Sequence, residues 1–267
     1  MTIGFIGAGR MAEALIARLG SSQKVIASDV KKVRLNYLRK KYKIRVAKSN
    51  LEVFRSGSII ILAVKPQNMA KVLEELRAQG TEHRTQKLVI SIAVGIPLKY
   101  LQKKLPGLPI VRAMPNNPCL VGMGITALTK GRSVNRGLFR KAGVIFEKVG
   151  GVVRVPEKWM DGVTGLSGSG PAFVYQMMEA LTSGGIAAGL PKNVAAMLAL
   201  QTVLGSAVTV KGTGKSPRDL RIMVTSPGGT TMEGLKVLNK RKFSRALRDA
   251  VVAAAKKSKA LNRKWTS

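Results

Sequence analysis

The feature that most constrains this chain is a glycine turn that directly follows a short apolar run near residue 1. Ile3–Ile6 has the composition of a buried strand, and Gly7-x-Gly9-x-x-Ala12 leads into an apolar-periodic helix that continues through Leu19. In such a pattern the first glycine makes a tight turn, the second lets backbone N–H groups approach a pyrophosphate, and the small third residue packs helix against strand. The pattern therefore predicts a dinucleotide site, and a plain glycine-rich turn of an α/β protein is the alternative.

Asp29 stands twenty residues after Gly9, at the expected end of the second strand. An acidic residue there accepts a hydrogen bond from a ribose 2′-hydroxyl, which favours NADH. Lys31, Lys32 and Arg34 follow at once, and their charge would neutralise a 2′-phosphate, which favours NADPH. These residues therefore leave both cofactors, NADPH and NADH, open.

The first half of the chain alternates β-rich runs with helical patterns, which is typical of a doubly wound parallel sheet. Strands are expected at 3–6, 24–28, 58–64, 87–94, 110–113 and 152–155. Helical patterns separate the early strands, for example at 69–79. We therefore predict an α/β fold with an N-terminal Rossmann-like dinucleotide-binding domain over residues 1–158.

From about Asp161 onward the pattern becomes helical. Helices are expected at 171–189 and 191–210, and the second of them is apolar on nearly every face. A stripe of apolar residues spaced by three and four follows at 243–254. A domain of about 100 residues cannot bury so much apolar helix alone, so a partner subunit is expected to cover it. We therefore predict an all-α dimerisation and substrate domain over residues 159–267.

Two segments of the helical half are rich in glycine and hydroxyl side chains. Residues 226–233 read Ser-Pro-Gly-Gly-Thr-Thr-Met-Glu, and Thr230 and Glu233 have the spacing of a capping box, which predicts a helix start. Free N–H groups at such a start suit a small carboxylate or phosphate, and a simple capped turn is the alternative. Residues 161–172 fit either a hydroxyl-lined pocket wall or a close-packed helix junction.

The chain is strongly basic, with 46 Lys and Arg against 13 Asp and Glu and a formal net charge of +33. Hydrophobic residues make up 45%, which excludes a disordered basic tail. The basic residues are spread over many segments, aromatic residues are only 4%, and residues 161–210 hold one base against two acids. We therefore expect a solvated basic exterior that binds nucleic acid non-specifically at low salt, and a nucleic-acid-binding protein is the alternative.

Composition also limits metal, membrane and targeting functions. The single cysteine, Cys119, excludes an intramolecular disulfide framework and a cysteine metal cluster, so no metal site is predicted. No uninterrupted apolar run reaches about 18 residues, so no membrane span is expected. The first residues lack the pattern of a signal peptide, and a cytoplasmic location is expected.

Five motifs stand in order along the chain: Gly4-Phe5-Ile6-Gly7-Ala8-Gly9, Ala63-Val64-Lys65-Pro66, Arg112-Ala113-Met114-Pro115-Asn116, the segment 163–172, and Ser226-Pro227-Gly228-Gly229-Thr230-Thr231. With these motifs the chain resembles the Δ1-pyrroline-5-carboxylate reductase family over essentially its whole length. The resemblance implies a Rossmann domain and a helical dimerisation domain, assembled as a homodimer or a ring of dimers, with active sites that involve two subunits. It also implies the last step of proline biosynthesis, the reduction of Δ1-pyrroline-5-carboxylate to L-proline by NADPH or NADH.

The resemblance further assigns roles to site residues. The cofactor would contact Ile6, Gly7, Ala8, Gly9, Arg10, Met11, Ser28, Asp29, Asn50, Ala63, Val64, Lys65, Pro66, Ala93 and Gly95. The substrate carboxylate would be held by Ser226, Gly228, Gly229, Thr230 and Thr231, which agrees with the anion site expected from that turn. Thr164, as the catalytic residue, would hydrogen-bond the ring nitrogen. The cyclic imine can bind already protonated, so a strong acid residue is not required.

The chain departs from the family pattern before its Ser-Pro-Gly-Gly turn. Ser216-Pro217 replaces the usual His-Pro, and residues 220–224 lack the Asp of a Leu-Lys-Asp-x-Val motif. Met223 occupies a position often filled by an Asn that contacts the cofactor, and Asn117 stands where Thr is common. These differences concern fine cofactor contacts more than the reaction itself.

A β-hydroxyacid-dehydrogenase-like NAD(P) oxidoreductase is the alternative enzyme, because it shares the glycine-rich start and the helical second half. In that family a glycine-rich segment also supplies a catalytic lysine. Residues 165–170 match the glycines, but Val174 occupies the lysine position. The acid/base group of the alternative is therefore missing.

Overall fold

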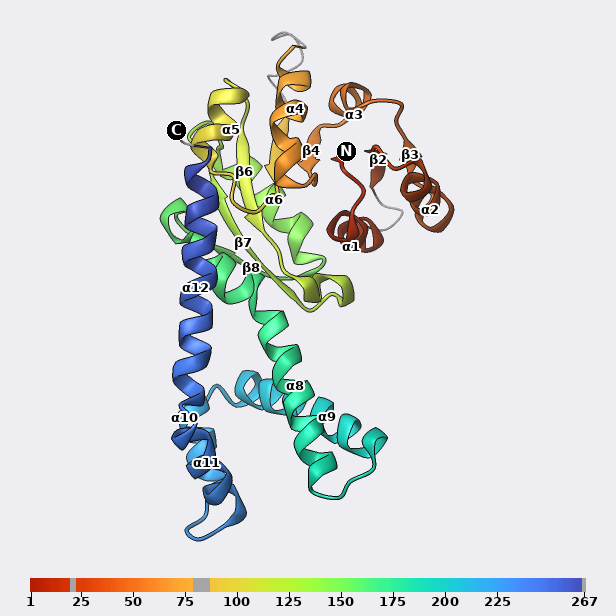
Figure 1. The fold of residues 1–267 in the computed structure, drawn as a ribbon. Coiled ribbons are helices and arrows are strands. Elements are labelled where there is room, and N and C mark those ends of the chain that lie inside the picture. The colour runs from red at the N-terminus through yellow and green to blue at the C-terminus, as the bar shows by residue number, and fades with distance from the viewer. Residues whose placement is uncertain (20–22, 79–86, 266–267) are drawn as a thin grey trace. The chain divides into compact units, whose positions relative to one another are not determined.

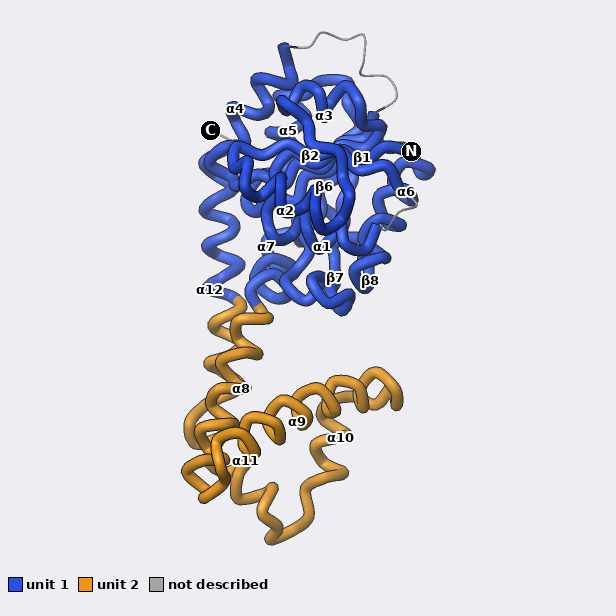
Figure 2. The backbone as a smooth tube through the Cα atoms, turned by 90° about the vertical axis from the view of Figure 1, so that its right-hand side faces the viewer, with its two compact units in different colours: residues 1–169, 252–267 blue, residues 170–251 orange. Residues whose placement is uncertain are grey.

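The computed structural model describes residues 1–19, 23–78 and 87–265, and the chain forms two compact units (Figures 1 and 2). The first unit comprises residues 1–169 and 252–267, and the second comprises residues 170–251. This division differs from the expected domain boundary between residues 158 and 159. Its physical reason lies in hydrogen bonds within the first unit, because Ser258 and Asn262 of the last helix both donate to Asp161.

The first unit is built on an eight-stranded sheet in the order β3-β2-β1-β4-β5-β6-β7-β8. The strands are β1 (Thr2–Ile6), β2 (Lys24–Ser28), β3 (Arg45–Val46), β4 (Ile59–Leu62), β5 (Leu88–Ser91), β6 (Ile110–Met114), β7 (Gly124–Lys130) and β8 (Gly150–Arg154). Neighbouring strands are parallel except β6 and β7, which are antiparallel. Because β1 lies between β2 and β4, the strand order reverses there, and the predicted doubly wound fold is confirmed.

Successive residues of the central strands face opposite sides of the sheet and divide the core into two layers. Ile3 and Phe5 pack with residues of α1 (Arg10–Leu19), α2 (Lys32–Tyr42) and α6 (Arg136–Glu147). Ile6 packs on the other face with α3 (Asn50–Ser56), α4 (Pro66–Arg77) and α5 (Leu98–Lys104). Burial on both faces explains why these strands are continuous apolar runs in the sequence.

The structure differs from the expected strands at several places. β4 ends at Leu62 and β5 ends at Ser91, because the apolar residues that follow each strand form loops at the carboxyl edge of the sheet. Two strands were not predicted from the sequence: β3, which has two residues, and β7, which pairs with both β6 and β8. Glycine and threonine interrupt the apolar residues of β7, so it lacks the run that marks a buried parallel strand.

The remaining elements are helical. In the first unit they are η1 (Asn117–Val121), η2 (Glu157–Trp159), α7 (Met160–Val163) and the π-helix η3 (Thr164–Gly168). The second unit holds α8 (Gly170–Ala187), α9 (Lys192–Thr213), α10 (Pro217–Met223) and α11 (Thr230–Lys240), and α12 (Phe243–Arg263) runs from the second unit into the first. α8 and α9 pack closely where Gly185 faces Ala195.

Large apolar side chains on α8 and α9 remain exposed in the single chain. They are Val174, Tyr175, Leu181, Ile186, Met197, Leu198, Leu200, Leu204 and Val208. Among the described residues, α9 is the one helix long and apolar enough to cross a membrane by length and composition, with a mean hydropathy of 1.5. The expectation of no membrane span rested on uninterrupted apolar runs. In α9, polar residues such as Gln201 and Ser206 interrupt the apolar run. One such helix is weak evidence for a membrane.

Glu13 of α1 links α1 to α2 through hydrogen bonds. Its carboxylate accepts hydrogen bonds from Arg34, from the Tyr37 hydroxyl (3.0 Å) and from the Tyr42 hydroxyl (3.0 Å), and Lys41 lies 3.4 Å away. Burial by itself raises the pKa of this carboxyl. The hydrogen bonds from Arg34, Tyr37 and Tyr42 outweigh burial and hold the pKa of Glu13 below its ordinary value of 4.5.

We predict that Glu13→Gln lowers the free energy of unfolding by about 1.5 kcal/mol at pH 7, because it weakens charge-assisted hydrogen bonds. A carboxyl whose pKa is lowered by folding stabilises the fold above its ordinary pKa of 4.5 and loses that contribution as the pH falls through the folded pKa. The difference between wild type and variant should therefore shrink below about pH 4. Urea denaturation at both pH values measures it, with the exposed Glu147→Gln as the control. A pH-independent difference would contradict this assignment.

Candidate active site

A cavity of about 870 Å³ lies where β1, β2 and β4 end. Nine of the residues expected at the cofactor line it: Gly7, Ala8, Gly9, Arg10, Asp29, Asn50, Ala63, Val64 and Lys65. This position is the carboxyl edge of the sheet beside the reversal of strand order, where doubly wound folds bind their ligands. The volume lies in the range of small-molecule and cofactor sites.

Gly7 makes the close backbone approach that forms the base of this cavity. Its φ is +99°, and a Cβ at this position would lie 2.7 Å from the carbonyl carbon and oxygen of Ala63. The Gly7 N–H donates to the Ser28 carbonyl (2.8 Å), and the Ala63 N–H donates to the Ile6 carbonyl (2.8 Å). By contrast, a Cβ at Gly9 would meet nothing within 4 Å, so the space over Gly9 is open.

The amino end of α1 faces this open space, since the helix begins at Arg10 directly after Gly9. The first N–H groups of a helix have no acceptor within the helix, and they attract phosphate oxygens. Lys65 and Lys71 add positive charge to the cavity wall. A glycine cradle, a helix amino end and basic side chains together fit the pyrophosphate of a dinucleotide.

Both carboxylate oxygens of Asp29 bind backbone N–H groups. Oδ2 accepts from Ala8 (2.6 Å) and Oδ1 accepts from Lys31 (2.8 Å). Arg34, which Glu13 holds, donates its Nε to the Ala8 carbonyl (2.8 Å). Asp29 therefore fixes the glycine turn, while Lys31 and Arg34 line the cavity beside it.

Asn50 is part of a hydrogen-bonded chain across the same end of the cavity. Ser28 donates its hydroxyl to Asn50 Oδ1 (2.7 Å), and Asn50 donates its amide Nδ2 to Glu75 (2.7 Å). Ser28 itself is buried, so it acts by orienting Asn50. Glu75 lines the cavity and, with Asp29, adds carboxylate acceptors beside the basic side chains.

One wall of the cavity was not predicted from the sequence: α4 supplies it through Gln67, Asn68, Lys71, Val72 and Glu75. Gln67, Lys71 and Glu75 are spaced by four residues, so they share one helix face. Polar residues at that spacing, directly after the strand end at Ala63–Pro66, were the available signal.

Other expected cofactor residues lie around the cavity without lining it. Ile6 is buried at the end of β1, Met11 packs on the core, and Pro66 is the first residue of α4. Ala93 and Gly95 lie in the loop between β5 and α5. Ala93 is buried, and Gly95 has a φ of +74°.

Thr164 opens the π-helix η3, and only 7% of it is exposed. Its hydroxyl donates to the Met160 carbonyl (2.8 Å). π-Helical turns are rare and occur frequently at functional sites. Because the hydroxyl proton is engaged by Met160, the Thr164 oxygen can serve as an acceptor for an external N–H group.

The turn at 226–229 belongs to the second unit. Gly229 is the N-cap of α11, and its N–H donates to the Ser226 carbonyl (3.1 Å). The expected capping box is wrong, because Thr230 lies inside the helix and Glu233 pairs with Lys236 (2.7 Å). No side chain caps α11, and the Met232 N–H donates to the Gly229 carbonyl (3.1 Å), so the N–H groups of Thr230 and Thr231 are the ones that can bind an anion.

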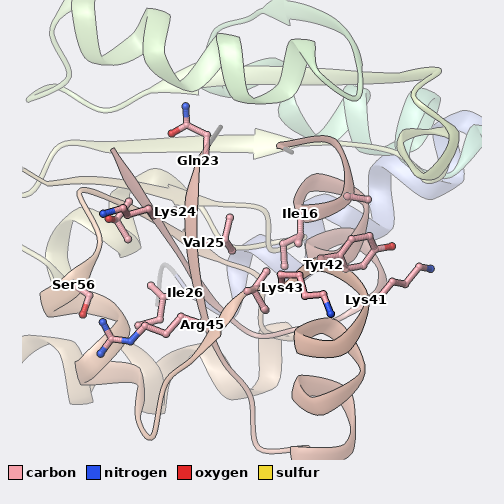
Figure 3. A pocket seen from close by; sticks show the side chains of 13 residues that line it. Ile16, Gln23, Lys24, Val25, Ile26, Lys41, Tyr42, Lys43, Arg45 and Ser56 are labelled. Carbon is pink, nitrogen blue, oxygen red and sulfur yellow. The ribbon is translucent and has the colours of Figure 1, made fainter. Parts of the chain in front are cut away.

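A second cavity, of about 740 Å³, lies beside β2 and contains none of the expected site residues (Figure 3). Lys24, Lys41, Lys43 and Arg45 line it. Figure 3 shows Lys24 and Lys41 extending in opposite directions, and Arg45 is paired with Glu52 (2.7 Å). These cations do not converge on a common point, so the first cavity is the candidate active site.

The doubly wound sheet, the glycine cradle and the basic cavity define an NAD(P)-dependent oxidoreductase with a Rossmann-type domain. Two family profiles agree with this class. "NADP oxidoreductase coenzyme F420-dependent" matches residues 2–95, and "Pyrroline-5-carboxylate reductase dimerisation" matches residues 157–261.

Curated and solved relatives identify the family. A pyrroline-5-carboxylate reductase of Synechocystis is 46% identical over 98% of both chains. The solved structure of a pyrroline-5-carboxylate reductase from Coxiella burnetii is 35% identical, with a TM-score of 0.89 over 97% of both chains. The Plasmodium falciparum pyrroline carboxylate reductase, solved with NADP bound, is 34% identical, with a TM-score of 0.88 over 98% of both chains. The chain belongs to the pyrroline-5-carboxylate reductase family.

We predict different effects for the two glycines of the turn. Gly7→Ala should lower the thermal midpoint by several degrees and abolish dinucleotide binding, because it places a Cβ against Ala63 at a positive φ. Gly9→Ala should leave the thermal midpoint nearly unchanged and still weaken binding at least tenfold, because its methyl group enters the open space for the ligand. Thermal unfolding without ligand and fluorescence titration with NADPH measure the two effects. Unchanged binding in Gly9→Ala would contradict the assigned pyrophosphate position.

Proposed function

We propose that this chain reduces Δ1-pyrroline-5-carboxylate to L-proline with NADPH or NADH, as the last step of proline biosynthesis. The observation that carries the proposal is the glycine-cradled cavity, in a unit that also holds the Ala93–Gly95 loop and Thr164. The names of relatives that cover almost the whole chain support the same reaction. In the β-hydroxyacid-dehydrogenase alternative a lysine would be needed at Val174, whose apolar side chain cannot transfer a proton.

A nicotinamide cofactor supplies the hydride in this reaction when it is bound. Gly7, Gly9 and the amino end of α1 would hold its pyrophosphate, and the loop containing Ala93 and Gly95 would border its nicotinamide. Thr164 accepts a hydrogen bond from the protonated ring nitrogen of the substrate, since its own proton is donated to Met160. The residue orients the ring and needs no pKa shift to do so.

The turn before α11 would bind the substrate carboxylate. Gly228 adopts a φ of +67° in this turn, the backbone N–H groups of Thr230 and Thr231 begin the helix, and Ser226, Thr230 and Thr231 add hydroxyl donors. A helix amino end favours a carboxylate because of the helix dipole and its unpaired N–H groups. Holding the carboxylate would restrict how the ring can turn.

The dimerisation domain of this family supports homo-oligomerisation. We infer that a second copy of the chain covers the exposed apolar faces of α8 and α9, and that dimers assemble further into a ring. On this proposal the functional domains are residues 1–158 and 159–267, no membrane is involved, and the enzyme is cytoplasmic. The basic exterior then attracts nucleic acid only non-specifically, through counterion release at low salt.

The charge around Asp29 supports NADPH as the preferred cofactor. Two backbone N–H groups engage the Asp29 carboxylate, which reduces its repulsion of a 2′-phosphate. Lys31 and Arg34 bring positive charge to the same end of the cavity. A 2′-phosphate would gain charge-assisted hydrogen bonds there that a 2′-hydroxyl cannot make.

The proposal is tested by following NADPH and NADH oxidation in parallel with added Δ1-pyrroline-5-carboxylate. We expect substrate-dependent oxidation, with kcat/KM for NADPH at least tenfold above that for NADH, because one charge-assisted hydrogen bond contributes about 1.5–3 kcal/mol. Folded protein that oxidises neither cofactor would disprove the reaction. A preference for NADH would show that Asp29 binds the ribose instead.

We predict that Thr164→Val, which keeps the side-chain volume and removes the hydroxyl, lowers kcat on the order of 10²-fold and changes the Kd of NADPH less than about twofold. Thr164→Ser should retain most of the activity, because it keeps an oxygen at the same position. Steady-state kinetics and fluorescence titration separate the two constants. Equal losses of turnover and cofactor binding would contradict the role of Thr164.

A further inference from the structure

Arg112, in the middle of β6, is a buried cation that the proposed chemistry does not use. Only 2% of its side chain is exposed, and it is the largest of the fully buried side chains. Its Nη1 donates to Glu157 Oε1 (2.7 Å), so β6 is linked to η2. A charge buried to this extent requires a partner, and Glu157 supplies it.

The same oxygen of Glu157 also binds the start of α5. The backbone N–H of Leu98, the first residue of α5, donates to Glu157 Oε1 (3.1 Å). Leu98 lies three residues after Gly95, at the end of the loop expected to border the nicotinamide. On its other side, Glu157 precedes Thr164 by seven residues, in the continuous helical segment of η2, α7 and η3.

We propose that Arg112 and Glu157 are positioning residues that fix the Ala93–Gly95 loop relative to Thr164. The inference rests on the proposed reductase function. It concerns residues of the first unit alone.

Packing between the two segments supports this role. Val94, between Ala93 and Gly95, packs on a small cluster that includes Met114 of β6 and Met160 of α7, together with Val163. Met114 also lies against Gly168 at the end of η3, where a Cβ would be 2.5 Å from its terminal carbon. The loop and the Thr164 turn therefore share one set of neighbours.

α12 contacts the same two segments from a distant part of the sequence. A Cβ at Gly95 would lie 2.9 Å from that of Leu261. Asp161, three residues before Thr164, accepts hydrogen bonds from Ser258 (2.7 Å) and Asn262 (2.5 Å). The packing cluster and α12 thus contact both the Ala93–Gly95 loop and the segment that contains Thr164. The Arg112–Glu157 ion pair adds hydrogen bonds of fixed direction between these segments.

The geometry of the Arg112–Glu157 pair indicates that it positions the two segments more than it stabilises the fold. One contact joins Arg112 and Glu157, and among the described residues neither Arg112 Nη2 nor Glu157 Oε2 has a hydrogen-bond partner. Arg112 is almost fully buried while the Glu157 side chain is 34% exposed, and one ionic hydrogen bond repays the lost solvation of a buried charge poorly, so apolar replacement of such a pair often leaves stability unchanged or improves it. The carboxylate oxygen is instead shared between Arg112 and Leu98, which fixes two segments at one point.

The test compares wild type with Glu157→Gln and with the double variant Arg112→Met/Glu157→Met. The double variant removes both charges, so no unpaired charge stays buried and the protein should fold with a thermal midpoint near that of wild type. Glu74→Gln, which removes an exposed partner of Lys104, is the control. The measurements are kcat, the Kd of NADPH, the isotope effect with NADPH deuterated at the transferred hydrogen, and the hydrogen-exchange rate of the Leu98 amide.

We expect both Glu157 variants to lose roughly ten- to a hundredfold in kcat, the effect of a displacement of about 1 Å at a reacting centre. The Kd of NADPH should change less than about twofold, the isotope effect should increase, and Leu98 should exchange faster in the double variant. The control should match wild type in each measurement.

A folded double variant with wild-type kcat and wild-type Leu98 exchange would overturn the inference. The inference would also be overturned if kcat fell only in proportion to a loss of cofactor binding or a fall in thermal midpoint, because such parallel losses indicate a structural role. If wild type itself shows no turnover, the proposed reaction fails, and Leu98 exchange in the double variant still decides whether the pair fixes the loop.

Discussion

The close contact between the backbones of Gly7 and Ala63 sets the geometry of the nucleotide cavity. Gly7 donates to the end of β2, while Ala63 donates to the end of β1, so three parallel strands end against one turn. Asp29 then holds the next residue of the turn through its amide. Because Gly7 and Gly9 carry no side chains, α1 can begin with its N–H groups directed at the ligand. The cavity walls supplied by α3 and α4 are arranged around this point.

Much of the first unit could be predicted from the sequence, because buried parallel strands are marked by continuous apolar runs and the glycine turn marks their junction with a helix. β7 could not, since its glycine and threonine residues are accommodated by pairing with neighbours on both sides. The predicted start of α11 was wrong by one residue. Gly229, whose N–H donates to the Ser226 carbonyl, is the N-cap of the helix in place of Thr230. The α4 wall was missed because polar spacing along a helix shows a shared face without showing what the face borders.

Five of the 13 acidic residues of this basic chain make hydrogen bonds that organise structure. Glu13 joins two helices, Asp29 fixes the glycine turn, and Asp161 binds α12. Glu75 accepts a hydrogen bond from Asn50, and Glu157 accepts hydrogen bonds from both Arg112 and Leu98. The high net charge therefore coexists with a few acidic side chains whose hydrogen bonds hold structural elements together. Charge of this kind affects encounter rates and solubility more than fold.

The uncovered apolar faces of α8 and α9 have a consequence for how the enzyme is made. In a newly synthesised monomer these faces are exposed to water. The lifetime of the monomer depends on how fast it associates with a second copy, and that rate rises with protein concentration. The net charge of +33 acts on this step, because like-charged chains repel one another and both assembly and aggregation slow down. Dissolved ions screen the repulsion beyond about 8–10 Å. Assembly of two copies should therefore become faster as the ionic strength rises.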